Sequence, residues 1–350
     1  METTVAQDQS ARRVVLLGAS AGGVDAISTV VGGLAPGLPA AVLVVLHVPA
    51  SGNSVLPAIL SRAGPLPARH AVDGERLLEG RVYVAPPDHH LVTADGQVRT
   101  TRSPKENGVR PAVDTLFRAA ARSHGRNVVA VVLSGTLDDG TAGLVAVKAH
   151  GGVTIAQDPT DAAFPSMPEN AVRFAHPDHV LPVHEVAAVV SKYVSVNDRE
   201  AAWPAGVYGV RATQAGPETA GQAATAADQP GMASGLNCPE CGGSLWEQVD
   251  GGLLRFRCRV GHAYSPDSLF SGQLDSLEGA LWSAVVGLHE RADLAERLAR
   301  RMVERGQRPI ATRYEGQAAD ARRRADQIRE AIVHLSRSRD PVEHDTQSGV

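Results

Sequence analysis

The sequence predicts an α/β fold in which helices cover both faces of a doubly wound, mostly parallel sheet. Between residue 13 and about residue 194, short apolar runs alternate with stretches of helical periodicity, a pattern typical of buried parallel strands. The expected strands are 14–18, 41–47, 81–86, 127–135, 152–157 and a last strand at 179–183. Helices are expected at 24–33, 53–63, 111–123 and 140–150. Segment 89–100 alternates around Asp95-Gly96 and predicts a β-hairpin insertion.

The rest of the chain predicts smaller parts after an α/β domain that spans 12–198. Residues 203–235 are rich in Ala, Gly, Thr, Gln and Pro, which is typical of a flexible linker. A cysteine-containing segment at 236–268 predicts a zinc-ribbon-like module. Residues 269–338 carry helical periodicity with a break near Gly306, so we expect a helical hairpin, and residues 339–350 are expected to be a disordered tail.

Composition places the chain among soluble globular proteins. Of its 350 residues 43% are hydrophobic and 21% charged, and the net charge of −4 argues against a general nucleic-acid binder. The longest wholly apolar stretch, AAVLVVL, is too short to span a bilayer, and the amino terminus has no apolar signal core. We therefore expect a cytoplasmic protein with no membrane insertion and no nucleic-acid partner.

Ser20 lies between Gly18 and Gly22, after an apolar run and before a predicted helix. This G-x-S-x-G spacing lets the backbone bend sharply and presents the serine as a candidate nucleophile. A dinucleotide fingerprint fits less well, because Ser20 stands in place of the second glycine and the second strand ends in His47, not in an acidic residue. A glycine-rich turn that only binds anions remains an alternative.

Three chemically complementary side chains follow three predicted parallel strands. They are Ser20, His47 and Asp139, and they meet at the carboxyl edge where open sheets bind ligands. In a serine hydrolase, His47 would take the Ser20 proton and Asp139 would orient the imidazole, while the N–H of Ala21 would stabilise an oxyanion. Asp138 is a second possible partner of His47. A rim histidine and an ordinary Asp-Gly turn are the structural alternatives.

Six motifs occur in one order along this region: GASAGG (18–23), LHVP (46–49), DGERLLEGRVYVAPPDHHL (73–91), RPAVDTLF (110–117), SGTLDDGTAGL (134–144) and FPSMP (164–168). Through them, residues 13–195 resemble the catalytic domain of the chemotaxis protein-glutamate methylesterase family. The resemblance assigns the triad to Ser20, His47 and Asp139 and leaves Asp138 outside it. It also implies that the backbone N–H of Thr136 is an oxyanion donor beside that of Ala21.

The resemblance implies a serine hydrolase that removes methyl esters from glutamyl side chains of a chemoreceptor-like signalling protein, with glutamine deamidation as a related activity. No cofactor is expected for catalysis. A carboxylesterase with another partner is one alternative. A signalling scaffold whose α/β domain only binds is the other.

Several features depart from the family pattern. Leu46 replaces a usual Gln, Thr136-Leu137 replaces Met-Gly, and Ala21 replaces a frequent Thr, so we expect substrate preference to differ. Members commonly carry an amino-terminal phospho-receiver domain, whereas about a dozen residues precede the first strand here. We therefore expect that the chain is not gated by a receiver domain of its own.

The three cysteines of the chain fall into a metal-ligand pattern. Cys238 and Cys241 form a C-x2-C pair, and after 16 residues Cys258 and His262 form a C-x3-H pair. These four ligands suit tetrahedral Zn²⁺ in a closed, structural site. Free thiols beside a surface histidine, an iron–sulfur site and a nucleic-acid-binding ribbon are the alternatives.

The expected helical hairpin carries many arginines interleaved with acidic residues. Apolar residues recur at roughly helical spacing, and they are Leu281, Val285, Leu288, Leu294, Leu298, Met302, Ile328, Ile332 and Leu335. A solvated face with ion pairs accounts for the charges. Docking or dimerisation through these helices is the functional alternative.

Overall fold

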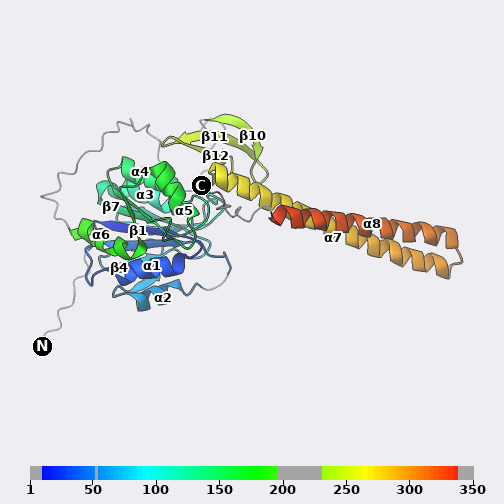
Figure 1. The fold of residues 1–350 in the computed structure, drawn as a ribbon, viewed down its shortest axis with the longest axis horizontal. Coiled ribbons are helices and arrows are strands. Elements are labelled where there is room, and N and C mark those ends of the chain that lie inside the picture. Colours follow the sequence, from blue (N-terminus) through cyan, green and yellow to red (C-terminus); the bar gives the residue numbers. More distant parts are fainter. Residues whose placement is uncertain (1–9, 52–53, 196–230, 338–350) are drawn as a thin grey trace, which may run out of the picture. The chain divides into compact units, whose positions relative to one another are not determined.

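The computed structural model describes residues 10–51, 54–195 and 231–337, and Figure 1 shows the fold. Most of the expected linker and the expected carboxyl-terminal tail lie outside the described residues.

A seven-stranded, fully parallel sheet forms the centre of the α/β domain, with strand order β3-β4-β2-β1-β7-β8-β9. The strands are β1 Val14–Ala19, β2 Ala41–Leu46, β3 Ala68–His70, β4 Arg81–Val84, β7 Val128–Val132, β8 Val153–Gln157 and β9 His179–Leu181. This confirms the predicted fold class. Edge strand β3 was missed because its three residues, Ala-Arg-His, contain no apolar run.

Helices cover both faces of the sheet (Figure 1). One face carries α1 Gly23–Gly32, α2 Leu56–Ala63 and α6 Val183–Ser195, and the other carries α3 Val113–His124, α4 Thr141–Ala149 and α5 Ser166–Asn170. Short helical turns follow α3 at Gly125–Asn127 and α5 at Ala171–Ala175. Sequence reasoning overlooked α6, although its buried Val186, Val190 and Val194 recur every four residues.

The predicted β-hairpin is present as a separate two-stranded sheet. Strand β5 (His90–Ala94) pairs antiparallel with β6 (Gln97–Thr101), and Ala94 faces Gln97 across the turn. Asp95 and Gly96 both have positive φ angles, of 52° and 70°, as a tight two-residue hairpin turn requires.

Two apolar clusters, one on each face of the sheet, make up the core of the α/β domain. In one of them Phe117 of α3 is fully buried. A Cβ atom added to Gly143 of α4 would lie 2.5 Å from the Phe117 Cβ, so only glycine allows α3 and α4 to approach this closely. This close contact helps to fix the start of α3, which borders the candidate site.

The cysteine-containing segment folds as a four-stranded antiparallel sheet. Its strands are β10 Met232–Asn237, β11 Ser244–Asp250, β12 Leu253–Cys258 and β13 Ala263–Tyr264. A small cluster of buried side chains fills one side, and it consists of Cys238, Leu245, Phe256, Cys258, Tyr264 and Leu269. The prediction that the linker continues to residue 235 was wrong, because Ala233 already pairs with Trp246 in this sheet.

Two long helices, α7 Pro266–Glu304 and α8 Arg308–Arg337, form the expected hairpin. Val285 of α7 clusters with Ala325 and Ile332 of α8. Further along α7, Ala292 and Ala295 cluster with the earlier α8 residues Ala318 and Ala321, so the helices run antiparallel. The seam depends on alanines more than the apolar spacing indicated, and Leu294 is 58% exposed. No described helix is both long enough and apolar enough to cross a membrane.

We predict that Phe117→Ala destabilises the α/β domain by about 3–5 kcal/mol, because it leaves a cavity in a close-packed core. The midpoint of the domain's urea unfolding transition measures the effect. Phe174→Ala is the matched control, since that ring is 43% exposed and its loss should change the midpoint little. Equal effects of the two substitutions would contradict this account of the core.

Candidate functional site

Ser20 lies on the turn that joins β1 to α1. Its backbone N–H donates to the Ser134 carbonyl oxygen at 3.0 Å, and its carbonyl oxygen accepts from the Gly23 N–H at 2.9 Å. Gly22 has a φ of 69°, and an added Cβ there would lie 2.8 Å from Ser134 Oγ. Glycine is therefore required for the sharp turn that presents Ser20 at the carboxyl edge of the sheet.

His47 is the cross-strand neighbour of Ser20. Parallel pairing of β1 with β2 ends at Ala19 opposite Leu46, and the His47 N–H continues the ladder to the Ala19 carbonyl oxygen at 3.2 Å. Adjacent strands lie about 4.8 Å apart, so the register itself brings Ser20 and His47 together. The Ser20 hydroxyl makes no hydrogen bond with any residue of the described ranges.

Asp139 follows β7 and binds the imidazole of His47. The distance from His47 Nε2 to Asp139 Oδ2 is 2.8 Å, and the aspartate side chain is only 3% exposed. In the serine-protease template the aspartate binds Nδ1, whereas here it binds Nε2, and His47 Nδ1 makes no hydrogen bond with a described residue. The structure thus joins His47 to Asp139, and its strand register brings in Ser20.

The amino terminus of α3 holds the buried Asp139 carboxylate. The N–H groups of Val113 and Asp114 donate to its two oxygens at 2.7 and 3.1 Å. Burial raises the pKa of Asp139, but the hydrogen bond and charge of His47 and these two N–H groups together lower it below the usual value. Asp139 is therefore ionised at neutral pH.

Sequence reasoning missed two polar residues of this network. Asn107 Nδ2 donates to Asp139 Oδ1 at 2.9 Å and to Asp114 Oδ2 at 3.0 Å. Asp114 also accepts from the N–H groups of Gly140 and Gly143, at 3.0 and 2.7 Å, and so ties the Asp139 loop to α3. The one signal in the sequence was an aspartate that falls on the apolar face of a predicted helix.

Asp138, the alternative partner of His47, makes a different contact. Its Oδ1 accepts from Ser265 Oγ at 2.7 Å. Burial raises the pKa of Asp138 to about 6, and the Ser265 hydrogen bond opposes this rise. The structure therefore brings Asp139, and not Asp138, to the imidazole.

The two expected oxyanion donors belong to segments that adjoin Ser20. Ala21 follows it directly, and Thr136 follows Gly135, where an added Cβ would lie 2.9 Å from the Ser20 Cβ. The backbone N–H groups of Ala21 and Thr136 have no hydrogen-bond partner among the described residues. Gly135 is fixed by the 164–168 segment, since its N–H donates to the Phe164 carbonyl oxygen at 2.9 Å and its carbonyl oxygen accepts from the Met167 N–H at 3.0 Å.

Cys238, Cys241, Cys258 and His262 converge at one point, and their ligand atoms lie within 4.8 Å of one another. Cys241 Sγ lies 3.6 Å from Cys258 Sγ, and His262 Nδ1 lies 3.5 Å from Cys258 Sγ and 3.7 Å from Cys238 Sγ. Four ligands around a tetrahedral Zn²⁺ with Zn–S bonds near 2.3 Å stand about 3.8 Å apart. The donor set and its spacing therefore fit this metal.

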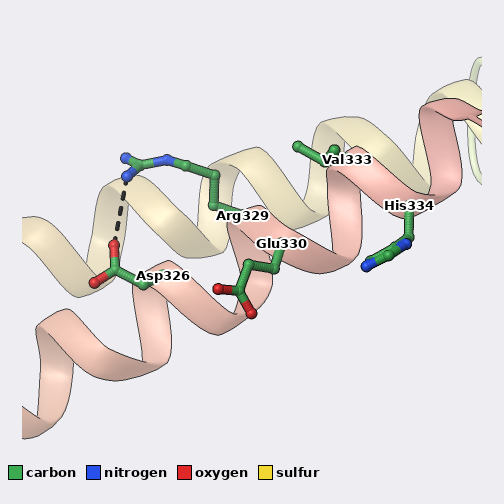
Figure 2. Close-up of a pocket in the computed structure, with 5 residues that line it drawn as sticks. All are labelled: Asp326, Arg329, Glu330, Val333 and His334. Atoms are coloured by element: carbon green, nitrogen blue, oxygen red, sulfur yellow. Dashed lines mark hydrogen bonds and ion pairs between the residues drawn. The ribbon is translucent and has the colours of Figure 1, made fainter.

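A shallow hollow on α8 is lined by Asp326, Arg329, Glu330, Val333 and His334 (Figure 2). All five side chains come from one helix, and Asp326 pairs with Arg329 at 3.4 Å. The hollow contains none of the predicted catalytic or metal-ligating residues.

Comparison with known proteins places the α/β domain in a known group. A family model described as CheB methylesterase matches residues 15–190. A protein-glutamate methylesterase/protein-glutamine glutaminase 2 of Pseudomonas aeruginosa is 38% identical over 185 residues, which cover 52% of this chain and 53% of the relative. The corresponding protein of Anaeromyxobacter dehalogenans is 40% identical over 173 residues, or 49% of this chain and 51% of the relative.

A solved structure is also similar. The catalytic domain of the Thermotoga maritima CheB methylesterase matches with a TM-score of 0.50 and 33% identity, over 51% of this chain and 97% of that domain. The chain spans about half the length of the curated relatives it matches.

The raised pKa of Asp138 predicts a pH-dependent stability. The unfolded state loses this proton near pH 4 and the folded state near pH 6, so the folded state binds more protons in between. The contribution of Asp138 to the free energy of unfolding is therefore lost as the pH rises through this window. Urea unfolding at pH 4 and at pH 6 measures the free energy of unfolding at the two ends of the window. This free energy should decrease less between the two pH values for Asp138→Asn than for the wild-type protein. An equal decrease in both would show that Asp138 titrates normally.

Proposed function

Because this chain belongs to the CheB methylesterase family, we propose that its α/β domain hydrolyses methyl esters of glutamyl side chains on a chemoreceptor-like signalling protein. The observation that carries the proposal is the pairing of buried Asp139 with His47, whose backbone is the direct neighbour of Ser20 in the strand register. A cytoplasmic receptor domain is the proposed partner.

In the proposed mechanism, Ser20 Oγ attacks the ester carbonyl carbon while His47 Nδ1 takes the hydroxyl proton. Asp139, bonded to Nε2, stabilises the imidazolium that forms. The N–H groups of Ala21 and Thr136 donate to the oxyanion, a contribution of roughly 3 kcal/mol per donor in comparable enzymes. Methanol leaves with the proton from His47, and water then hydrolyses the acyl-serine by the same route in reverse.

Glutamine deamidation is the second proposed activity, and the printed names of the relatives, which include protein-glutamine glutaminase, favour it. The same serine would attack an amide carbonyl, with ammonia as the leaving group. No cofactor takes part in either reaction as proposed.

The Cys238, Cys241, Cys258 and His262 cluster is proposed to bind one structural Zn²⁺. The four ligand atoms would fill a tetrahedral shell and leave no position for substrate. The ion would add stability to a four-stranded module whose own core consists of a few side chains.

We predict that Ser20→Ala abolishes methanol release from methylated receptor while the fold is retained, because the acyl-enzyme cannot form. Gas-chromatographic detection of methanol and far-UV circular dichroism measure the two quantities. Ser61→Ala, a serine on α2 away from the strand ends, is the matched control and should release methanol normally. Turnover by Ser20→Ala would refute the assignment.

We predict that the purified protein contains about one zinc ion per chain and that Cys241→Ser loses it, because three ligands hold the ion far less tightly than four. Elemental analysis by mass spectrometry provides the measurement. Ser234→Ala, in the same module, should keep the metal. A folded, metal-free preparation of the unchanged protein would disprove the site.

A further inference from the structure

The four-stranded module makes buried polar contacts with the residues behind the candidate triad. Arg255 of β12 is only 6% exposed, and its guanidinium donates to Asp114 Oδ2 at 3.1 Å and to Glu106 Oε1. Glu106 is also paired with Arg118 of α3. Arg255 thus crosses from the cysteine-containing module into the carboxylate network that surrounds Asp139.

Asn107 forms a second connection. Its N–H donates to the Ala263 carbonyl oxygen at 2.7 Å, and its Oδ1 accepts from the Ser265 N–H at 3.1 Å and from Ser268 Oγ at 3.2 Å. A backbone N–H can only donate, so the amide oxygen of Asn107 must face Ser265. The amide nitrogen must then face Asp139 and Asp114, as observed.

This network holds more carboxyl groups than permanent cations. The carboxyl groups of Glu106, Asp114 and Asp139 are buried, and Asp138 is partly buried beside them. Two guanidinium groups, of Arg118 and Arg255, face them together with the imidazole of His47. His90 is neutral, because burial lowers its pKa and its Nδ1 accepts from the Ala112 N–H. Arg118 pairs with Glu106, so Arg255 is the cation in direct contact with Asp114.

We propose that the module positions the catalytic aspartate: Arg255 supplies the charge, and residues 263–268 the hydrogen bonds, that hold Asp114 and Asn107 against Asp139. Ester hydrolysis by the α/β domain then depends on a segment outside that domain. Arg255 is a positioning residue, because it contacts neither His47 nor Ser20. This inference rests on the proposed esterase function.

The hydrogen bonds and charges around Asp114 predict the direction in which its pKa shifts when Arg255 is removed. Burial and then the charge of Asp139 raise the pKa of Asp114 to about 7, while Arg255 opposes the rise. All four groups that contact its oxygens are donors, so a protonated Asp114 would have to expel one of them. Loss of Arg255 should therefore raise this pKa further and disturb Asn107 at neutral pH.

The test compares full-length Arg255→Gln and Arg255→Lys with Arg259→Gln, an exposed arginine of the same module. The measurements are kcat/KM for methanol release as a function of pH, and the carboxyl ¹³C shift of Asp114 during titration. Arg255→Gln should move the acid limb of the profile and the Asp114 titration upward by about one pH unit, and so lose about tenfold in rate below neutrality. Arg255→Lys should shift both by less than Arg255→Gln does. Arg259→Gln should give the same profile and the same titration as the wild-type protein.

A folded Arg255→Gln variant whose acid limb lies at the wild-type pH would overturn the inference. A lower maximal rate would not rescue it, because a purely structural role reduces the amount of active enzyme without moving the pH profile. If Arg255→Gln does not fold, the same two measurements on Arg255→Lys test the inference. A single ammonium cannot donate to both Asp114 and Glu106 in the geometry of the guanidinium. If the wild-type protein releases no methanol, the proposed function is refuted instead. The Asp114 titration would still show in that case whether Arg255 controls the network.

Discussion

The candidate site depends on keeping a charged carboxylate, Asp139, almost completely out of water. An isolated buried carboxylate is strongly disfavoured, so every oxygen lone pair needs a donor. Four donors meet this need: the imidazole of His47, the amide of Asn107 and the N–H groups of Val113 and Asp114. One side chain therefore requires three segments to keep their relative positions: the start of α3, the loop after β7 and the end of β2.

The topology of the sheet explains why these groups can meet. Strand β1 lies between β2 and β7, so the direction of winding reverses there, and the carboxyl ends of the strands at such a reversal are where open α/β sheets bind ligands. Ser20, His47 and Asp139 follow three adjacent strands, although His47 and Asp139 are 92 residues apart in the chain. The glycines at 18 and 140 allow α3 to pack closely here, because an added Cβ at either would lie within 2.9 Å of the Val113 side chain.

The four-stranded module supplies a charge to the buried acids of the α/β domain. Asp114 and Glu106 are buried acids whose charges are compensated in part by Arg255, a residue of another sheet. A buried ion pair of this kind is costly to break, because removal of one partner leaves an uncompensated charge. The module therefore contributes to the electrostatics of the site as well as holding a metal-ligating cluster.

The sequence by itself determined the fold class, the hairpin turn and the identity of the residues that follow the strands. It could do so because apolar runs, an Asp-Gly turn and strand-terminal Ser20, His47 and Asp139 are local patterns. It also identified Cys238, Cys241, Cys258 and His262, whose spacing reflects two tight turns. Short β3 and the early start of β10 were missed, because pairing with distant strands stabilises them more than their own propensity does. Helix α6 differs from them, since its apolar periodicity is present in the sequence.

Spacing alone left Asp138 and Asp139 equivalent, since neighbouring residues on one loop have the same chemistry and differ only in direction. The family resemblance pointed to Asp139, and the tertiary structure shows that it is Asp139 that binds His47. It alone revealed Asn107, Asp114 and Arg255 as one network, because they lie on different elements and no spacing rule connects residues 107 and 255. Periodicity can indicate which residues are buried. Which buried charges compensate one another is set by contacts that form only when the distant segments fold together.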